Sequence, residues 1–137
     1  MKPDIPILLV EDDAVDAMTV ERALKDIRVT NRVHTVGDGL AALEYLREPG
    51  ARRPGIILLD LNMPRMNGIE FLKVLKSDES LRKIPVVVLT TSSDERDRVN
   101  SFDLGVAGYM IKPVDYIQFV EVVRTINLYW TISELPD

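Results

Sequence analysis

The chain contains no cysteine, and this absence excludes several kinds of chemistry. Disulfide bonds, a thiolate nucleophile and cysteine-ligated zinc are all ruled out. The first ten residues hold one lysine and only a short apolar run before Glu11, which resembles neither a secretory signal nor a membrane span. We therefore expect a cytoplasmic protein.

Positive charge is also scarce. The chain has 17 Lys and Arg against 22 Asp and Glu, and its basic residues form no cluster. The resulting net charge of −5 argues against nucleic acid or an anionic membrane as the main partner. With 137 residues, 46% of them hydrophobic, the chain can fill one core but not two. We expect a single domain over residues 1–137, with its core in 5–130 and a short C-terminal tail.

Short apolar runs alternate with segments of helical length. Apolar runs predict strands at 5–10, 32–36, 56–60, 86–90 and 108–111. Helical spacing of apolar residues predicts helices that include 20–27, 39–47, 68–76, 94–104 and 116–130. Five strands, each followed by a helix, indicate an α/β fold, a doubly wound (βα)5 parallel sheet covered on both faces.

Four of the five predicted strands end in unusual chemistry. Glu11 and Asp12 follow the first strand, and Asp60 ends the third although the residues before it are fully apolar. The other two ends are Thr90 and Lys112. Because the carboxyl ends of parallel strands share one edge of the sheet, where such folds bind ligands, we expect these side chains to meet.

The three carboxylates would repel one another, by roughly 4 kcal/mol per close pair at an effective dielectric constant near 20. A hard divalent cation with oxygen ligands relieves this repulsion, and Mg²⁺ is the expected ion, with Mn²⁺ as an alternative. Lys112 adds a fixed positive charge, and the Thr90 hydroxyl can donate a hydrogen bond. A metal ion, an ammonium group and a hydroxyl around one carboxylate favour phosphoryl transfer to Asp60, which would form an aspartyl phosphate.

Four motifs carry a family resemblance. The motifs are LLVEDD (8–13), LLDLNMPRMNG (58–68), PVVVLT (85–90) and GYMIKP (108–113). In this order and spacing they resemble the receiver domain of bacterial response regulators. The resemblance spans nearly the whole chain and implies a flavodoxin-like fold with strand order 2-1-3-4-5. It also implies two-component signal transduction, in which a histidine kinase supplies the phosphoryl group. Because only a short tail follows the predicted fifth helix in this sequence, we expect the output to be a phosphorylation-dependent protein contact.

The resemblance also implies a role for each matching residue. Asp60 is the implied phosphorylation site, and Asp12 is the principal direct metal ligand, with Glu11 binding the metal through water. Asn62 is implied to offer its backbone carbonyl to the metal. Thr90, Tyr109 and Lys112 match the residues that contact the phosphoryl group or switch with it.

Each of these residues also has a purely structural interpretation. An aspartate after a strand often caps a helix, as we expect of Asp13, and a lysine before a proline is usually solvated. His34 is expected to be structural. Two functional alternatives remain: a phosphohydrolase of the haloacid dehalogenase type, which has a second Asp where this chain has Asn62, and a degenerate receiver that only binds. We expect no enzymatic turnover.

Further stretches indicate the partners. Four stretches resemble the stand-alone receivers that are paired with phytochrome kinases. They are EDDAVDAMTVERAL (11–24), VGDGLAALEYLR (36–47), LTTSSDERD (89–97) and the last residues of the sequence, INLYW followed by ELPD. We therefore expect a phytochrome-type sensor histidine kinase, or a phosphotransfer protein, docking beside Ala14, Val15 and Met18. In the helix predicted over 116–130, Tyr116, Phe119 and Val122 lie on one wide apolar arc, whereas Ile117 and Leu128 fall on the other side and are either an interface or two harmless surface residues. The resemblance to receivers implies that such an interface is a homodimer through the fourth helix, fifth strand and fifth helix.

Overall fold

The computed structural model describes residues 5–61, 66–90, 97, 99–100, 103–122 and 124 of the chain. These residues form one parallel sheet of five strands in the order β2-β1-β3-β4-β5. The strands are β1 (Ile7–Val10), β2 (Val33–Val36), β3 (Ile56–Asp60), β4 (Val86–Thr90) and β5 (Gly108–Ile111). The helices are α1 (Ala14–Asp26), α2 (Gly39–Arg47) and α3 (Gly68–Ser77), and residues 116–122 are also helical. The predicted fold class and strand order are confirmed.

The predicted boundaries agree closely with the structure. β3, β4, β5 and α2 begin and end where the sequence predicts. β1 begins two residues later than predicted, at Ile7, because Pro6 has no amide hydrogen to donate to a strand ladder. Most of the predicted helix over 94–104 and the end of the helix predicted over 116–130 lie outside the described residues.

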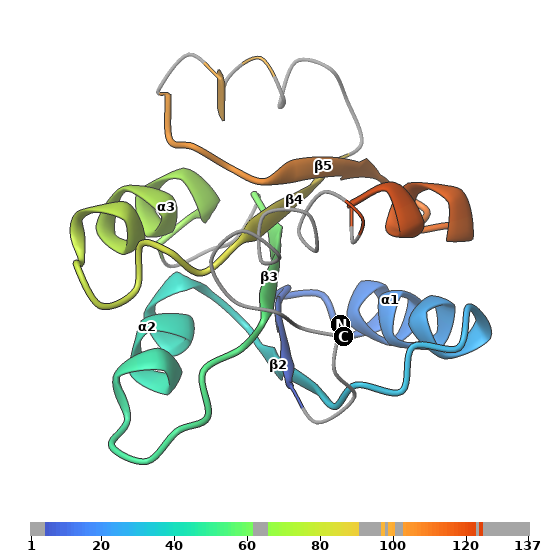
Figure 1. Ribbon diagram of the computed structural model, residues 1–137, viewed down its shortest axis with the longest axis horizontal. Coiled ribbons are helices and arrows are strands. Elements are labelled where there is room, and N and C mark those ends of the chain that lie inside the picture. The colour runs from blue at the N-terminus through green and yellow to red at the C-terminus, as the bar shows by residue number, and fades with distance from the viewer. Residues whose placement is uncertain are drawn as a thin grey trace.

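Helices cover both faces of the sheet, with α2 and α3 on one side and α1 and residues 116–122 on the other (Figure 1), and a hydrophobic layer fills each side. Successive strand residues point to opposite faces. In β1, Leu8 and Val10 pack with α2 and α3, whereas Ile7 and Leu9 pack with α1 and the helical residues that follow β5. Because both faces are covered, β1, β3 and β4 are buried along their whole length, as their unbroken apolar runs require.

The last helical segment departs from prediction at its first residue. Its apolar arc places Tyr116 with Phe119 and Val122 against the core, and the latter two are indeed buried. Tyr116, however, is 60% exposed. A helical wheel gives a direction around the axis, but it does not tell whether another element covers that turn.

Polar side chains cap the helices that follow the strands. The Asp13 side chain accepts hydrogen bonds from the amides of Val15 and Asp16, so its predicted role as the α1 cap is confirmed. Asn67 begins α3 with a reciprocal capping box. None of the helices in the described ranges is long and apolar enough to cross a membrane.

Candidate phosphoryl and metal site

The pleat of the sheet brings three of the predicted site residues to the same face. Glu11, Asp60 and Lys112 each lie two residues after a side chain that packs on the α1 face, namely Leu9, Leu58 and Met110. A spacing of two residues keeps a side chain on one face of a strand. The three groups therefore leave the sheet on the side of α1, at the edge where its strands end, which we call the carboxyl edge.

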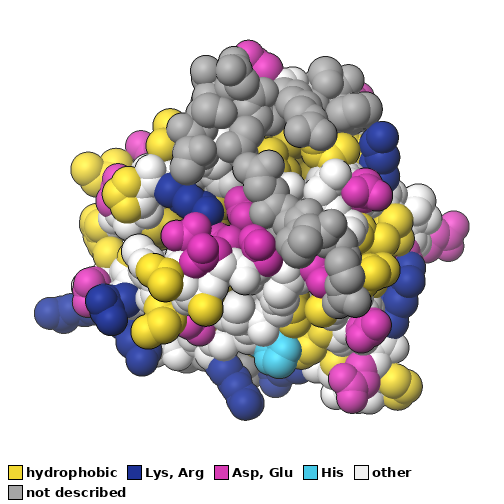
Figure 2. All heavy atoms as spheres, turned by 180° about the vertical axis from the view of Figure 1, so that it is seen from behind, with side chains coloured by type: hydrophobic (Ala, Val, Ile, Leu, Met, Phe, Trp, Pro, Cys, Tyr) yellow, Lys and Arg dark blue, Asp and Glu magenta, His cyan; other side chains and the backbone are white. Residues whose placement is uncertain are grey.

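Three carboxylates converge at this edge. Glu11, Asp12 and Asp60, which we call the acidic cluster, each offer an oxygen atom, and these atoms lie within 4.8 Å of one another. Glu11 and Asp60 are 3% and 7% exposed, whereas Asp12 is open to solvent. Figure 2 shows acidic side chains gathered beside a basic one on the face opposite to the view of Figure 1. The structure thus brings these predicted residues together.

Lys112 is the cation of this site. Its Nζ lies 2.9 Å from Glu11 Oε1 and 3.6 Å from Asp60 Oδ1. The stronger contact is therefore with Glu11, not with Asp60. Because Nζ also remains near Asp60, it lies beside the place where a group added to Asp60 would sit.

Burial and charge change the ionisation of this pair. Burial raises the pKa of Glu11 to about 7, the hydrogen bond from Lys112 opposes this change, and Asp60 adds to it. For Lys112, burial lowers the pKa, but the hydrogen bond with Glu11 and the charge of Asp60 outweigh burial, so the pKa lies above its usual value. The ammonium group stays charged among carboxylates that repel one another.

Asp12 is the member of the acidic cluster best placed to bind a cation. It immediately precedes the Asp13 cap of α1, so the helix start fixes its backbone. Its carboxylate has no hydrogen bond or ion pair with another described residue. Glu11, by contrast, already accepts a hydrogen bond from Lys112. These donors are all oxygen atoms, the ligands that Mg²⁺ and similar hard cations take in proteins, so the residues fit such an ion.

The start of α3 approaches the end of β3 closely because of a glycine. A Cβ atom added to Gly68 would lie 2.7 Å from the Cα atom of Leu61 and 2.9 Å from the carbonyl oxygen of Asp60. Any larger residue would push α3 away from the strand end that carries Asp60. Gly68 therefore helps to shape the site without contributing a side chain.

Thr90 and Tyr109 belong to the other face of the same edge. Thr90, at the end of β4, is 2% exposed, and Asp60 of β3 pairs in register with Leu89. The Tyr109 side chain is half-buried, and its hydroxyl donates to Asn100 Oδ1. Tyr109 is thus directed toward the segment after β4.

One predicted residue cannot be placed and one neighbour was missed. Asn62 lies outside the described residues. The sequence reasoning did not single out Asp16, whose Oδ2 lies 3.8 Å from Lys112 Nζ. Its position in the first turn of α1, directly after the acidic residues at the end of β1, is a signal that was available. His34 stacks on Tyr45, with ring centroids 4.2 Å apart, as befits a structural role.

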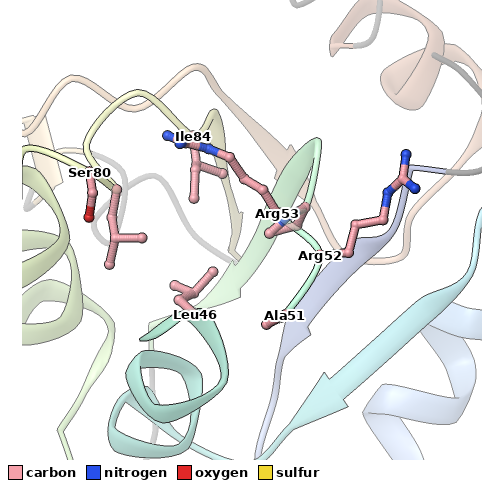
Figure 3. Close-up of a pocket in the computed structure, with 8 residues that line it drawn as sticks. Leu46, Ala51, Arg52, Arg53, Ser80 and Ile84 are labelled. Carbon is pink, nitrogen blue, oxygen red and sulfur yellow. The ribbon is translucent and has the colours of Figure 1, made fainter. Parts of the chain in front are cut away.

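A pocket of about 190 Å³ lies away from this site. It opens at the amino edge, where the strands begin, and the residues that line it come from the end of α2, the loop before β3 and the turn before β4. In Figure 3, Arg53 extends toward Ile84, whereas Arg52 points away from it. None of the acidic cluster lines this pocket.

Comparison with known proteins agrees with this geometry. The family model "Response regulator receiver domain" matches residues 7–124. Response regulator Rcp1 of Synechocystis is 39% identical, with 93% of this chain and 90% of Rcp1 covered. The probable methanogenesis regulatory protein FilR2 of Methanothrix harundinacea is 43% identical, with 90% and 82% covered.

Solved structures give the same result. The bacteriophytochrome response regulator AtBRR has a TM-score of 0.84 at 38% identity and covers 94% of this chain and 96% of its own. Phosphorylated RcpA, a cyanobacterial phytochrome response regulator, has a TM-score of 0.73 at 41% identity, with 98% and 99% covered. The Mn²⁺-bound form of Rcp1 has a TM-score of 0.70 at 38% identity, with 97% and 99% covered.

Proposed function

The chain belongs to the response regulator receiver domain family of two-component signalling, and we propose that it accepts a phosphoryl group on Asp60. The observation that carries the proposal is a buried carboxylate at a strand end, with Lys112 Nζ 3.6 Å away and two further carboxylates beside it. A charge in this position costs folding free energy, so its presence favours a chemical role.

The chain's own groups account for most of the transfer. An Asp60 carboxylate oxygen attacks the phosphorus of a phosphohistidine, the P–N bond breaks, and the imidazole of the donor leaves. Lys112 Nζ, which lies beside Asp60, stabilises the negative charge on the transferring oxygens. The Thr90 hydroxyl, at the end of the neighbouring strand, then donates to a phosphoryl oxygen.

We propose Mg²⁺, with Mn²⁺ as an alternative, as the cation held by Asp12, Asp60 and the backbone carbonyl of Asn62, with Glu11 acting through water. When bound, it would neutralise charge on the phosphoryl oxygens. The oxygen-rich acidic cluster supports this assignment, as does the Mn²⁺-bound form of the relative Rcp1.

We propose that the phosphoryl group stays on Asp60 rather than being released with turnover. A haloacid dehalogenase type hydrolase needs a second aspartate two residues after the first, and this position holds Asn62. A degenerate receiver would lack Asp12, Asp60 or Lys112, and all three are present. Sustained release of phosphate from excess acetyl phosphate would contradict the proposal.

Phosphorylation of Asp60 is tested by comparing wild type with Asp60→Asn. Both proteins are incubated with a phosphorylated histidine kinase and Mg²⁺. We expect acid-stable, hydroxylamine-labile label in the wild type and none in Asp60→Asn. Equal incorporation in both would rule out Asp60 as the acceptor.

The proposed phosphodonor is a sensor histidine kinase of the phytochrome type, and we place the exchange in the cytoplasm. The likeness to AtBRR and RcpA supports this donor, while the likeness to FilR2 keeps a different kinase as the alternative. Transfer rates from a panel of purified kinases decide between them, and preference for a non-photosensory kinase would reject the phytochrome assignment.

The first turns of α1 supply a docking surface for this donor. Val15 and Met18 are 70% and 56% exposed, close in sequence to Asp12. Figure 2 shows hydrophobic side chains on the same face as the acidic ones. An exposed apolar patch beside a reactive group fits a helical bundle that presents a phosphohistidine. Undiminished transfer to Val15→Asp/Met18→Asp would reject this surface.

We further propose a homodimer through the fourth helix, fifth strand and fifth helix. Ile111, Tyr116 and Ile117 support it, because these large hydrophobic side chains are 57%, 60% and 69% exposed. Leu128, the other predicted contact, lies outside the described residues. Sedimentation of wild type against Ile117→Glu, with and without phosphorylation, measures the association, and a monomer in every condition would contradict it.

A further inference from the structure

Among the described residues β5 is an edge strand, so the backbone groups on its outer side have no neighbouring strand in that part of the chain. Successive residues of a strand direct their backbone groups to opposite sides. The amide of Lys112 is directed inward and donates to the carbonyl of Thr90, with an N···O distance of 2.9 Å. The amide and carbonyl of Ile111, one residue earlier, are therefore directed outward.

The side chain of Gln118 binds these outward groups. The Ile111 amide donates to Gln118 Oε1 at 2.7 Å, and Gln118 Nε2 donates to the Ile111 carbonyl at 3.0 Å. The same Nε2 lies 3.3 Å from the carbonyl oxygen of Pro113. A single carboxamide thus bonds the backbone on both sides of Lys112, an arrangement that we call the Gln118 bridge.

Asp115 fixes the Gln118 bridge from behind. Its Oδ1 accepts a hydrogen bond from the backbone amide of Gln118 at 2.9 Å and so caps the helical residues 116–122. Its Oδ2 accepts a hydrogen bond from Gln118 Nε2 at 3.0 Å. Each hydrogen bond restricts the side chain to the rotamer that the next hydrogen bond needs. The carboxamide is therefore held in one orientation against the strand end.

Lys112 depends on this support because its side chain is long and flexible. Its backbone has the Thr90 carbonyl on one side and the Gln118 bridge on the other, while Nζ reaches Glu11 and Asp60. We propose that Gln118 is a positioning residue that holds the Lys112 backbone so that Nζ meets the phosphoryl group on Asp60. This inference rests on the proposed function.

The test is the affinity of the metal-loaded protein for beryllofluoride, a stand-in for the phosphoryl group. Gln118→Met keeps the length of the side chain but removes all of its hydrogen bonds to the strand end. We expect binding to weaken on the order of tenfold, which is less than the roughly hundredfold that a 1 Å displacement of a reacting group can cost. Mg²⁺ affinity, measured without beryllofluoride, should stay unchanged, because the bridge acts through Lys112 and not through Asp12.

Three variants make the result specific. Leu40→Ala is the control, since it removes a partly exposed apolar side chain from α2, away from the Gln118 bridge and from the proposed interfaces. Gln118→Asn keeps the carboxamide but is too short to reach Ile111, and it should weaken binding in the same way even if Gln118→Met folds poorly. In a Lys112→Ala background, Gln118→Met should add no further loss, which is the mark of coupled residues.

Each outcome is decisive. Wild-type affinity in Gln118→Met or Gln118→Asn would overturn the positioning role, as would an equal loss with and without the Lys112 side chain. Parallel loss of Mg²⁺ affinity would show a general structural effect and would also overturn it. Failure of the wild type itself to bind beryllofluoride would instead count against the proposed function.

Discussion

At the carboxyl edge of the sheet, charges are buried: Glu11 and Asp60 lie within the fold and Lys112 is mostly covered. At the amino edge the opposite holds, because Arg52 and Arg53 are exposed while Ile84, which lines the same pocket, is 1% exposed. Both edges are made by the same strands. The difference shows that the buried charges do not follow from the sheet architecture, which closes equally well over apolar residues.

Free energy explains why the two edges diverge. Burying carboxylates close together costs stability that a single ammonium group restores only in part. Apolar residues at the amino edge carry no such cost and add to the hydrophobic core. We therefore expect substitutions of buried apolar residues at the amino edge to lower stability and leave phosphorylation intact, and substitutions of the charged residues at the carboxyl edge to change phosphorylation.

The largest expected effect is on stability at the amino edge. Ile84→Ala removes a buried side chain from the floor of the pocket and should lower the free energy of unfolding by about 2–5 kcal/mol. Urea unfolding measures the loss. The folded fraction should still accept phosphate at the wild-type rate, and a large defect in that rate would join the two edges functionally.

Next comes cation affinity at the carboxyl edge. Asp12→Asn should weaken Mg²⁺ binding by at least the roughly 10- to 100-fold that the loss of an outer-shell partner costs, because it removes a proposed direct ligand whose carboxylate has no hydrogen bond or ion pair with another described residue. Glu11→Gln should weaken it less, because Glu11 is already bonded to Lys112. Calorimetric titration of both variants measures the difference. Equal affinities in wild type and Asp12→Asn would exclude Asp12 as a ligand.

The sequence predicted most of this edge because parallel strands end together. Once β1, β3, β4 and β5 are recognised, their next residues must be neighbours, and the acidic cluster follows without any coordinates. The confirmed fold and the cap at Asp13 rest on equally local signals, namely apolar runs and a short polar side chain before a helix.

Side-chain contacts could not be predicted in this way. Strand order brings Lys112 near both Glu11 and Asp60, but only the distances show that Glu11 is its closer partner. Gln118 has no periodic or motif signal, since its role depends on the outward direction of one peptide group in an edge strand. The prediction that Tyr116 packs against the core was wrong, because the burial of a helix turn depends on which other element covers it.

A third expected effect separates accepting phosphate from responding to it. Thr90→Ala should be phosphorylated, because the Asp60 carboxylate and Lys112 remain. Phosphorylated Thr90→Ala should bind its partner about tenfold more weakly than phosphorylated wild type, and so lose most of the gain in partner affinity. The reason is that it lacks the hydroxyl whose hydrogen bond to the phosphoryl oxygen favours the active state. Binding assays with phosphorylated proteins measure the gain, and a full gain in Thr90→Ala would remove this coupling.

A smaller change tests the cost of the buried carboxylates. Without metal, Asp60→Asn should raise the free energy of unfolding by about 1 kcal/mol, because it removes repulsion from Glu11 and Asp12 and loses only the more distant contact of Lys112. Thermal unfolding in a chelator measures the change, and added Mg²⁺ should favour the wild type again.

The matched control for this change lies away from the acidic cluster. Hydrogen bonds from Ser80 hold the pKa of Asp78 below its usual value, with help from Arg47. That carboxylate is therefore stabilised as an anion, so Asp78→Asn should not raise stability. A stabilising Asp78→Asn, or a destabilising Asp60→Asn, would contradict the account of buried charge given by the two edges.

The smallest expected effect is that of Arg53 at the amino edge. Its guanidinium has no hydrogen bond or ion pair with any residue in the described part of the chain, and it extends over the pocket toward Ile84 (Figure 3). Arg53→Ala should therefore change the free energy of unfolding by less than about 0.5 kcal/mol and leave Asp60 phosphorylation unchanged. Arg53→Lys, which keeps the charge, controls for long-range electrostatics. If Arg53→Ala slowed phosphorylation and Arg53→Lys restored it, the charge at the amino edge would be acting on the carboxyl edge, and the separation of roles between the two edges would fail.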